Sequence, residues 1–281
     1  MKLIAESGSS KTEWRLILEN EHKTFVTKGI NPFFADEPFI FSELSCSDLD
    51  GYKDQITQLI FYGSGCSSED RNQYLTTIFK RYFTNANSIT VDHDMMAACI
   101  ALFGRGDGIA CIIGTGSNSC VYQKGIITHN VPALGYILGD EASGSFIGKE
   151  IMKHYIYKTL PSPIYTYIHD TYRIDKEDIF DGVYSKPLPN RFLASFSTIA
   201  SEFRSDSFIQ EILLRGFDEF VRYHILCYKD FLHLPIAAVG SIASVFQEEF
   251  QYVLKKYDLK LDKVDMKPID ALVHYHEINI E

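Results

Sequence analysis

The sequence lacks any apolar run that approaches the roughly 18 residues of a membrane-spanning helix. It also lacks an excess of basic residues: 27 Lys and Arg stand against 37 Asp and Glu, which gives a formal net charge of −10. Nucleic-acid binding through phosphate neutralisation needs a basic surface, so we expect no nucleic-acid partner and no membrane partner. Glu6 follows the first apolar residues too early for a signal peptide, and we expect a cytoplasmic protein.

Cysteine is also sparse, and its spacing excludes two common uses. The six cysteines are scattered and form no CxxC pair, so neither a zinc ribbon nor a thioredoxin-like redox site is expected. We expect reduced thiols, as in other cytoplasmic proteins. The remaining composition is ordinary: 46% of the 281 residues are hydrophobic and 23% are charged, which excludes disordered and collagen-like classes. This length suits one large domain or two medium ones.

One pattern of three strands occurs twice along the chain. In each copy a short loop of small residues joins the first two strands, and a turn joins the second strand to the third. We predict strands at residues 2–5, 12–18 and 22–28 in the first copy, and at 108–113, 119–122 and 126–130 in the second. An offset of 108 residues aligns Gly8 with Gly116 and Trp14 with Tyr122. This repeat predicts two related domains, because solenoid repeats span only about 20–50 residues.

Helices alternate with strands after each copy, which indicates an α/β fold. In the first half we expect a strand at 59–62, a helix capped by Ser67, a strand at 89–91 and a helix at 95–103. In the second half we expect helices at about 143–160 and 209–228, a strand at 235–239 and a helix from about residue 243. The proline-containing segment 161–190 is expected to be a loop or lid insertion.

The two small-residue loops are candidate phosphate sites. The first reads Glu6-Ser7-Gly8-Ser9-Ser10-Lys11-Thr12, and the second reads Gly114-Thr115-Gly116-Ser117-Asn118. Small residues let backbone amides approach an anion, and Lys11 adds a positive charge. The first loop is not a P-loop, because the GxxxxGK[ST] spacing is absent and it enters a strand; an ordinary hairpin turn is the alternative. Because the loops stand at matching positions of a repeat, together they could bind one polyphosphate.

Acidic residues at strand–helix and loop–helix junctions are candidates for the chemistry. Asp94 could act as general base near a sugar hydroxyl, and its alternative is a helix N-cap. His93 beside it is expected to be a surface or cap residue. Asp140 or Glu141 could bind hydroxyls or a magnesium-bound water, and their alternative is a capping box. At the junction Gly240-Ser241, a flat base could lie against the bare backbone.

The chain resembles the BadF/BadG/BcrA/BcrD ATPase family, which contains N-acetylglucosamine kinase and belongs to the sugar kinase, Hsp70 and actin superfamily. The motifs that carry the resemblance, in family order, are residues 6–14, Asn31-Pro32, Asp94, 114–118, 135–141 and Gly240-Ser241. The resemblance implies an α/β fold of two ribonuclease-H-like (actin-like ATPase) domains that flank a nucleotide cleft. We expect these domains at 1–92 and 93–267, with a C-terminal helix at about 268–281 packed back on the first.

The resemblance also implies ATP and Mg²⁺ as cofactors and assigns residues to them. The β- and γ-phosphates would lie at Gly8, Ser9, Ser10, Lys11 and Thr12, and the second phosphate loop would comprise Gly114, Thr115, Gly116 and Ser117. Gly240 and Ser241 would lie near the adenosine. Glu6 would hold Mg²⁺ through water, at a position where the family usually has Asp.

The implied reaction is ATP-dependent phosphoryl transfer to a hydroxyl of an amino sugar such as N-acetylglucosamine. Asp94 matches the family's catalytic base, and Asn31, Asn118 and Asp140 match positions that bind the sugar hydroxyls. Leu134 stands where N-acetylglucosamine kinases carry a Trp. The partner would be a small sugar, and the resemblance also implies a homodimer.

Two other functions remain open from the sequence. One is that of the related ATPase activators of radical dehydratases, whose iron–sulfur cluster bridges a dimer through cysteines of each subunit. The other is a non-catalytic, sugar-sensing module on the kinase fold, since a fold does not fix a function.

Overall fold

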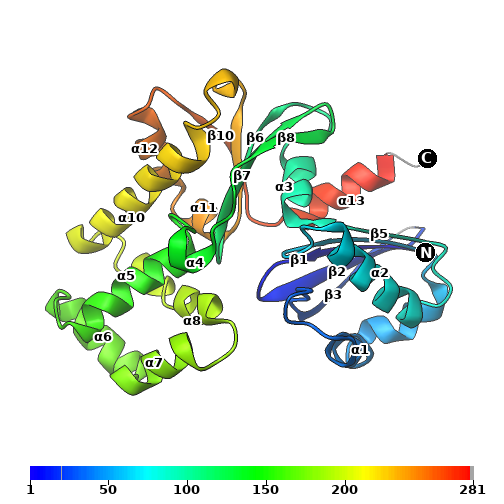
Figure 1. The fold of residues 1–281 in the computed structure, drawn as a ribbon, viewed down its shortest axis with the longest axis horizontal. Coiled ribbons are helices and arrows are strands. Elements are labelled where there is room, and N and C mark those ends of the chain that lie inside the picture. Colours follow the sequence, from blue (N-terminus) through cyan, green and yellow to red (C-terminus); the bar gives the residue numbers. More distant parts are fainter. Residues whose placement is uncertain (20, 279–281) are drawn as a thin grey trace. The chain divides into compact units, whose positions relative to one another are not determined.

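The chain folds into two α/β units in the computed structural model, which describes residues 1–19 and 21–278 (Figure 1). The first unit comprises Met1–Arg105 and the C-terminal segment that starts at Lys267, and the second comprises Gly106–Met266. Each unit has one five-stranded sheet and its own apolar core. Within the described residues, none of the helices combines the length and apolar character that crossing a membrane requires.

The sheet of the first unit has the strand order β3-β2-β1-β4-β5. Its strands are β1 (Lys2–Ser7), β2 (Lys11–Ile17), β3 (His22–Lys28), β4 (Gln58–Gly63) and β5 (Ser88–His93). The first three strands pair antiparallel, whereas β4 and β5 run parallel to β1. The three parallel strands end in register at Ser7, Gly63 and His93, so the residues that follow them gather at one edge of the sheet.

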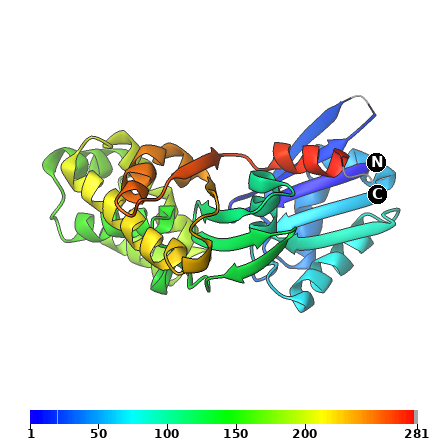
Figure 2. The ribbon, with the colours of Figure 1, turned by 90° about the horizontal axis from the view of Figure 1, so that it is seen from above.

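Helices cover both faces of this sheet. One face carries α1 (Glu37–Ser45), the 3₁₀ segment Asp48–Gln55 and α2 (Glu69–Tyr82), and the other carries α3 (Asp94–Phe103) and α13 (Ile269–Ile278). Trp14 is fully buried on the first face, where its ring packs against Phe61 and Phe79. On the second face, Leu272 of α13 packs with Ile4; Figure 2 shows this C-terminal helix, in red, beside the blue N-terminal strands.

The second unit has the same arrangement, with the strand order β10-β9-β6-β7-β8. Its strands are β6 (Gly108–Ile113), β7 (Ser117–Gln123), β8 (Ile126–Asn130), β9 (Ile236–Val239) and β10 (Leu261–Asp265). Its helices are α4 (Gly135–Leu138), α5 (Gly144–Ile156), α6 (Ser162–Tyr172), α7 (Lys176–Tyr184), α8 (Pro189–Ser195), α9 (Thr198–Glu202), α10 (Ser207–Phe220), α11 (Ser241–Val245) and α12 (Gln247–Lys255). Helices α5, α10 and α12 share a core cluster with Ile109, Cys111 and Val121 of the sheet.

The predicted repeat is confirmed, but the pairing of Trp14 with Tyr122 is wrong. Four residues separate the last paired residues across the first loop, and only three do so across the second, so no single offset aligns both strands. Val121 rather than Tyr122 joins the cluster that corresponds to that of Trp14. Successive strand residues point to opposite faces, so an error of one residue moves a side chain from one face to the other.

Segment 161–190 is largely helical, and the expectation of a loop there is wrong. It contains α6 and α7. Two of its prolines lie at helix starts, since Pro163 and Pro189 stand within the first two positions of α6 and α8. Proline is favoured there because its missing amide hydrogen would have no partner in the helix. The cap predicted for α2 is also wrong by one residue: the N-cap is Ser68, not Ser67.

Candidate functional site

The first loop presents two backbone amides without partners. It connects β1 to β2, and the amide of Gly8 donates to the carbonyl of Lys11 at 3.0 Å. The carbonyl of Ser10 accepts from the amide of Gly29 at 3.2 Å, but within the described part of the chain the amides of Ser9 and Ser10 donate to nothing. Such amides can bind an anion.

Thr12 supports this loop from behind. Its hydroxyl is fully buried, lies 2.7 Å from the hydroxyl of Ser7 and donates to the carbonyl of Lys28 at 3.1 Å. Both hydroxyls accept from the amide of Ile30. Of the five predicted phosphate residues in this loop, Thr12 thus has its side chain engaged within the fold. Residue 29 packs behind the loop and has to be glycine, because a Cβ there would lie only 2.8 Å from the carbonyl oxygen of Ser9.

Asp94 begins α3 but does not cap it, so the capping alternative is wrong. The N-cap is His93, whose Nδ1 accepts from the amide of Met96 at 3.2 Å. The Asp94 carboxyl is half-buried, and burial raises its pKa. Hydrogen bonds from the backbone amides of Met95 and Asp94 lower that pKa in part. The carboxyl is therefore held in a poorly solvated position without a structural duty as cap.

Glu6 lies on β1 within electrostatic range of Asp94. Burial, and then the charge of Asp94, raise the pKa of Glu6 to about 7, while Lys11 works in the opposite direction. Two neighbouring carboxyl groups in a poorly solvated place favour a bound cation, because their repulsion is only partly offset by Lys11.

Asn31 lies against the loop that follows β4. Its Oδ1 accepts from the amide of Phe33 at 2.9 Å and occupies the space that a Cβ on Gly65 would need. Gly65 has a φ of +84°, which favours glycine for a second reason. The neighbouring Ser64 donates its amide to Ser7 at 2.9 Å, and its buried hydroxyl has no partner among the described residues.

Ser64 is a site residue that the sequence analysis missed. The signal was available, since Gly63-Ser64-Gly65 follows a buried strand. Ligands of α/β sheets bind beyond the carboxyl ends of parallel strands, and β4 ends beside β1 and β5. In the first unit the structure thus brings together the first loop, Glu6, Asn31 and Asp94.

The second loop is anchored by its carbonyl groups. The carbonyls of Gly114 and Thr115 accept from the amides of Gly144 and Ser145 in the first turn of α5, at 2.8 and 3.1 Å. The amides of Thr115 and Gly116 have no partner within residues 1–19 and 21–278. This loop therefore also leaves amide donors available to an anion. The buried hydroxyl of Ser117 likewise has no partner there.

Asp140 shapes the second loop. Its Oδ1 accepts from the amide of Ser117 at 3.0 Å, and a Cβ at Gly116 would lie 2.9 Å from the same carboxylate. Burial raises the pKa of Asp140, and the Ser117 amide partly offsets this. The capping-box alternative for this residue is wrong, because the cap of α5 is Ser143, which accepts from the amide of Phe146 at 3.2 Å.

Glu141 forms a buried pair that the sequence did not reveal. Its carboxylate lies 3.1 Å from Nε2 of His224, and this hydrogen bond lowers the pKa of Glu141. His224 lies in a π-helical turn, Val221–Ile225, that continues α10. Its carbonyl accepts from the hydroxyl of Ser119 at 2.6 Å. No local motif could connect residues so far apart in the sequence.

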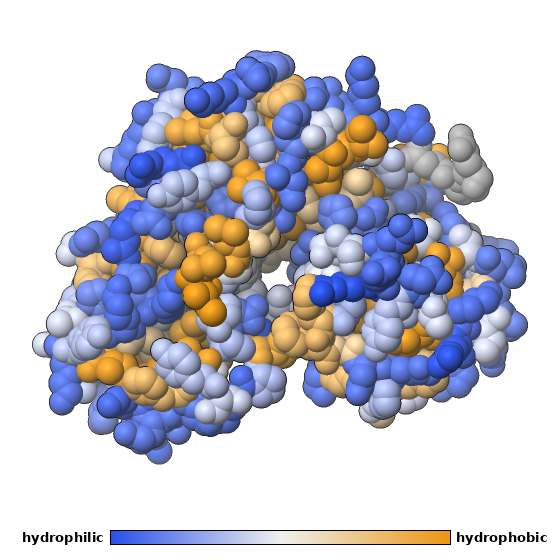
Figure 3. Space-filling model, viewed as in Figure 1, coloured by the Kyte–Doolittle hydropathy of each residue, from blue (hydrophilic) through white to orange (hydrophobic). Residues whose placement is uncertain are grey.

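The other predicted sugar residue of this unit, Asn118, has its side chain partly engaged. Its Oδ1 accepts from the amide of Ser119 at 2.8 Å and from Nδ2 of Asn130 at 3.2 Å. The side chain of Leu134 is 58% exposed, and those of Ile137 and Leu138 in α4 are more exposed still. Apolar patches of this kind interrupt a mostly polar surface in Figure 3.

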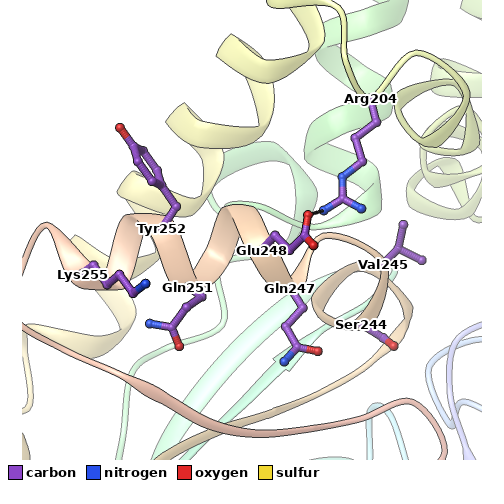
Figure 4. A pocket seen from close by; sticks show the side chains of 8 residues that line it. All are labelled: Arg204, Ser244, Val245, Gln247, Glu248, Gln251, Tyr252 and Lys255. Carbon is purple, nitrogen blue, oxygen red and sulfur yellow. Dashed lines mark hydrogen bonds and ion pairs between the residues drawn. The ribbon is translucent and has the colours of Figure 1, made fainter.

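Gly240 packs directly against the start of the second loop. Its φ is +116°, and a Cβ there would overlap the carbonyl of Ile113. Ser241 begins α11. A pocket of about 600 Å³ lies on α11 and α12, and Figure 4 shows its lining: Arg204, Ser244, Val245, Gln247, Glu248, Gln251, Tyr252 and Lys255. In the second unit, Asp140 and Gly240 thus both lie against the second loop. The pocket lies on α11 and α12, the two helices that follow Gly240.

Three solved structures are similar over nearly the whole chain. A candidate N-acetylglucosamine kinase from Porphyromonas gingivalis is 35% identical, with a TM-score of 0.93 and 99% of both chains covered. This chain belongs to the same family. A candidate N-acetylglucosamine kinase from Chromobacterium violaceum is 15% identical, with a TM-score of 0.72 and 98% of both chains covered. MreB5 of Spiroplasma citri bound to ADP is 9% identical, with a TM-score of 0.55, and 99% of this chain matches 95% of that one.

The last two structures share the fold alone. No family model matches the chain, and no curated protein does. The fold is that of the sugar kinases and actin-like ATPases, which confirms the α/β fold class expected from the sequence.

Proposed function

We propose that this protein is an ATP-dependent sugar kinase that phosphorylates a hydroxyl of an amino sugar such as N-acetylglucosamine. Its family relationship to the candidate N-acetylglucosamine kinase of Porphyromonas gingivalis supports this. The observation that carries the proposal is the state of Asp94: a half-buried carboxyl with a raised pKa, at the carboxyl end of a parallel strand, and relieved of capping by His93. We further propose membership of the BadF/BadG/BcrA/BcrD ATPase family.

In this proposal each small-residue loop binds phosphate oxygens of ATP. The free amides of Ser9 and Ser10, with Lys11, serve in the first loop, and those of Thr115 and Gly116 serve in the second. Hydrogen bonds from fixed amides stabilise the charge that develops on the transferred phosphoryl group. Gly240 and Ser241 would lie near the adenosine.

The residues present fit a magnesium ion beside the first loop. Glu6 would hold it through water, and the crowding of Glu6 with Asp94 supports a cation there. When bound, Mg²⁺ supplies positive charge to the phosphate oxygens.

Asp94 accepts the proton of the sugar hydroxyl as that hydroxyl attacks the γ-phosphorus in line with the leaving ADP. Its raised pKa supports this role, because burial shifts the pKa of the carboxyl toward the operating pH, where a general base works best. Asn31, Asn118 and the remaining oxygen of Asp140 would orient the sugar hydroxyls. Positioning and charge neutralisation supply most of the catalysis in phosphoryl transfer.

The test is ADP release with a panel of N-acetylated and free hexosamines. We expect turnover with at least one amino sugar, and Asp94→Asn should lower kcat by about 10²–10⁴-fold. Asp181→Asn, an exposed aspartate of α7 paired with Lys186, is the matched control and should keep wild-type turnover. Near-normal turnover of Asp94→Asn would refute the assignment of the base, and a wild-type protein that phosphorylates no sugar of the panel would refute the function.

A further inference from the structure

We propose that His93 is a positioning residue, whose neutral imidazole fixes the first turn of α3 and thereby holds the Asp94 carboxyl in its working place. This inference rests on the proposed function for its catalytic meaning.

His93 is an unusual helix cap. Ser, Thr, Asp and Asn are the residues normally found at this position. His93 has the extended backbone of an N-cap, with φ −84° and ψ 157°, and its Nδ1 accepts from the amide of Met96 at 3.2 Å. An imidazole nitrogen accepts a hydrogen bond only when it carries no proton, so the cap requires the neutral ring with its hydrogen on Nε2.

The backbone of His93 is held from the strand side as well. Its amide donates to Oδ1 of Asp92 at 2.7 Å, and the same oxygen lies 3.7 Å from Nε2. Across the sheet, His93 pairs in register with Gly63 of β4. His93 therefore connects a fixed strand end to the first turn of a helix, and Asp94 is the first residue of that turn.

Because His93 caps α3, the carboxyl of Asp94 is not needed as the cap. Asp94 would be the favoured residue type for an N-cap, yet it stands one position later. Because His93 satisfies the Met96 amide, the Asp94 carboxyl is not needed as its acceptor, and it interacts instead with the backbone amides of Asp94 and Met95. Loss of the cap would let the first turn fray, because its amides would lack a partner. Displacement of a catalytic group by about 1 Å can cost about a hundredfold in rate.

The test compares His93→Ala, His93→Asn and the wild-type chain by two measurements. One is hydrogen exchange at the amide of Met96, and the other is kcat and KM in the ADP-release assay. The control is Asp175→Ala, which removes the cap of α7, where Asp175 accepts from the amide of Asp178 at 2.9 Å.

We expect His93→Ala to lose protection at Met96 and to lower kcat about tenfold, while the KM for the sugar changes by less than about twofold. His93→Asn should restore both, because the Asn side-chain oxygen is a good cap acceptor. Asp175→Ala should lower the melting temperature and leave kcat and Met96 protection unchanged.

The inference is overturned if His93→Ala keeps wild-type kcat while Met96 is exposed, or if His93→Asn restores protection but not kcat. Unchanged Met96 exchange in His93→Ala also overturns it, whether or not any sugar is turned over. A wild-type protein without turnover counts against the proposed function alone. Exposure of Met96 in His93→Ala, with rescue by His93→Asn, would still support His93 as the residue that fixes this turn.

Discussion

The ionisation of the Glu6 side chain depends on its surroundings. Burial and the nearby Asp94 raise its pKa to about 7. The folded chain therefore holds this proton more tightly than the unfolded chain, where a Glu has a pKa of about 4.3. The resulting contribution to stability is fully present below the unfolded pKa and is lost as the pH rises through about 7.

Glu6→Gln should remove this pH dependence. Between about pH 5 and pH 8, we expect the wild type to lose up to about 3 kcal/mol of unfolding free energy relative to the variant. The measurement is thermal unfolding in metal-free buffer. Glu43→Gln is the control of opposite sign. Burial acts to raise the pKa of Glu43, but hydrogen bonds from Lys28 lower it overall. The ionised Glu43 therefore stabilises the fold above about pH 4.5, and this stabilisation is lost as the pH falls further. Parallel pH curves for wild type and Glu6→Gln would contradict the raised pKa.

Backbone hydrogen bonds join the second loop to the start of α5, and Asp140, which precedes α5, accepts from the end of the loop. Asp140→Ala leaves the Ser117 amide without its acceptor at 3.0 Å and opens space beside Gly116. Hydrogen bonds to charged groups contribute about 1.5–3 kcal/mol, so we expect the affinity for ATP to fall at least about tenfold. Calorimetry with ATP measures this without a known sugar.

Asp107→Ala provides the matched control for that variant. Asp107 accepts from the amide of Lys124 at 2.9 Å, in a turn of the same sheet. Its removal deletes a bond of the same kind but should leave ATP affinity unchanged. Equal affinities for the Asp140 and Asp107 variants would show that Asp140 does not shape a nucleotide loop.

Elements were predictable from sequence where a local pattern determines them. The strands of both three-stranded copies were predicted closely, because alternating apolar residues and turn residues mark them. Helix α6 was missed because a proline that starts a helix resembles one that breaks it, and α7, which lies in the same segment and starts with a capping box at Asp175, was missed with it. Asp94 was predicted as a candidate base, but only coordinates could distinguish it from a cap, since the cap depends on where the His93 ring points. The pairing of Glu141 with His224 had no local signal.

On the scale of the whole molecule, the first unit is completed by residues from the far end of the chain. α13 packs on α3 and β1 through Ile269, Leu272 and Val273, all of them buried. Leu272→Ala should lower the free energy of unfolding by about 2–5 kcal/mol, because it removes a fully buried side chain and leaves a cavity. Chemical denaturation measures this.

His274→Ala, an exposed position of the same helix, is the control and should change stability by less than about 0.5 kcal/mol. Equal stabilities of the two variants would mean that α13 contributes little to the core of the first unit.

The position of α13 also bears on how the protein is made. A ribosome synthesises Met1–Arg105 first, but Leu272, which covers one face of that sheet, emerges only after the whole of Gly106–Met266. While the second unit is being translated, the N-terminal sheet exposes apolar residues such as Ile4 and Ile60 that α13 will later cover. The unit that is synthesised first is thus the last to be finished, and nascent chains that stall within the second unit should be the ones that most need a chaperone.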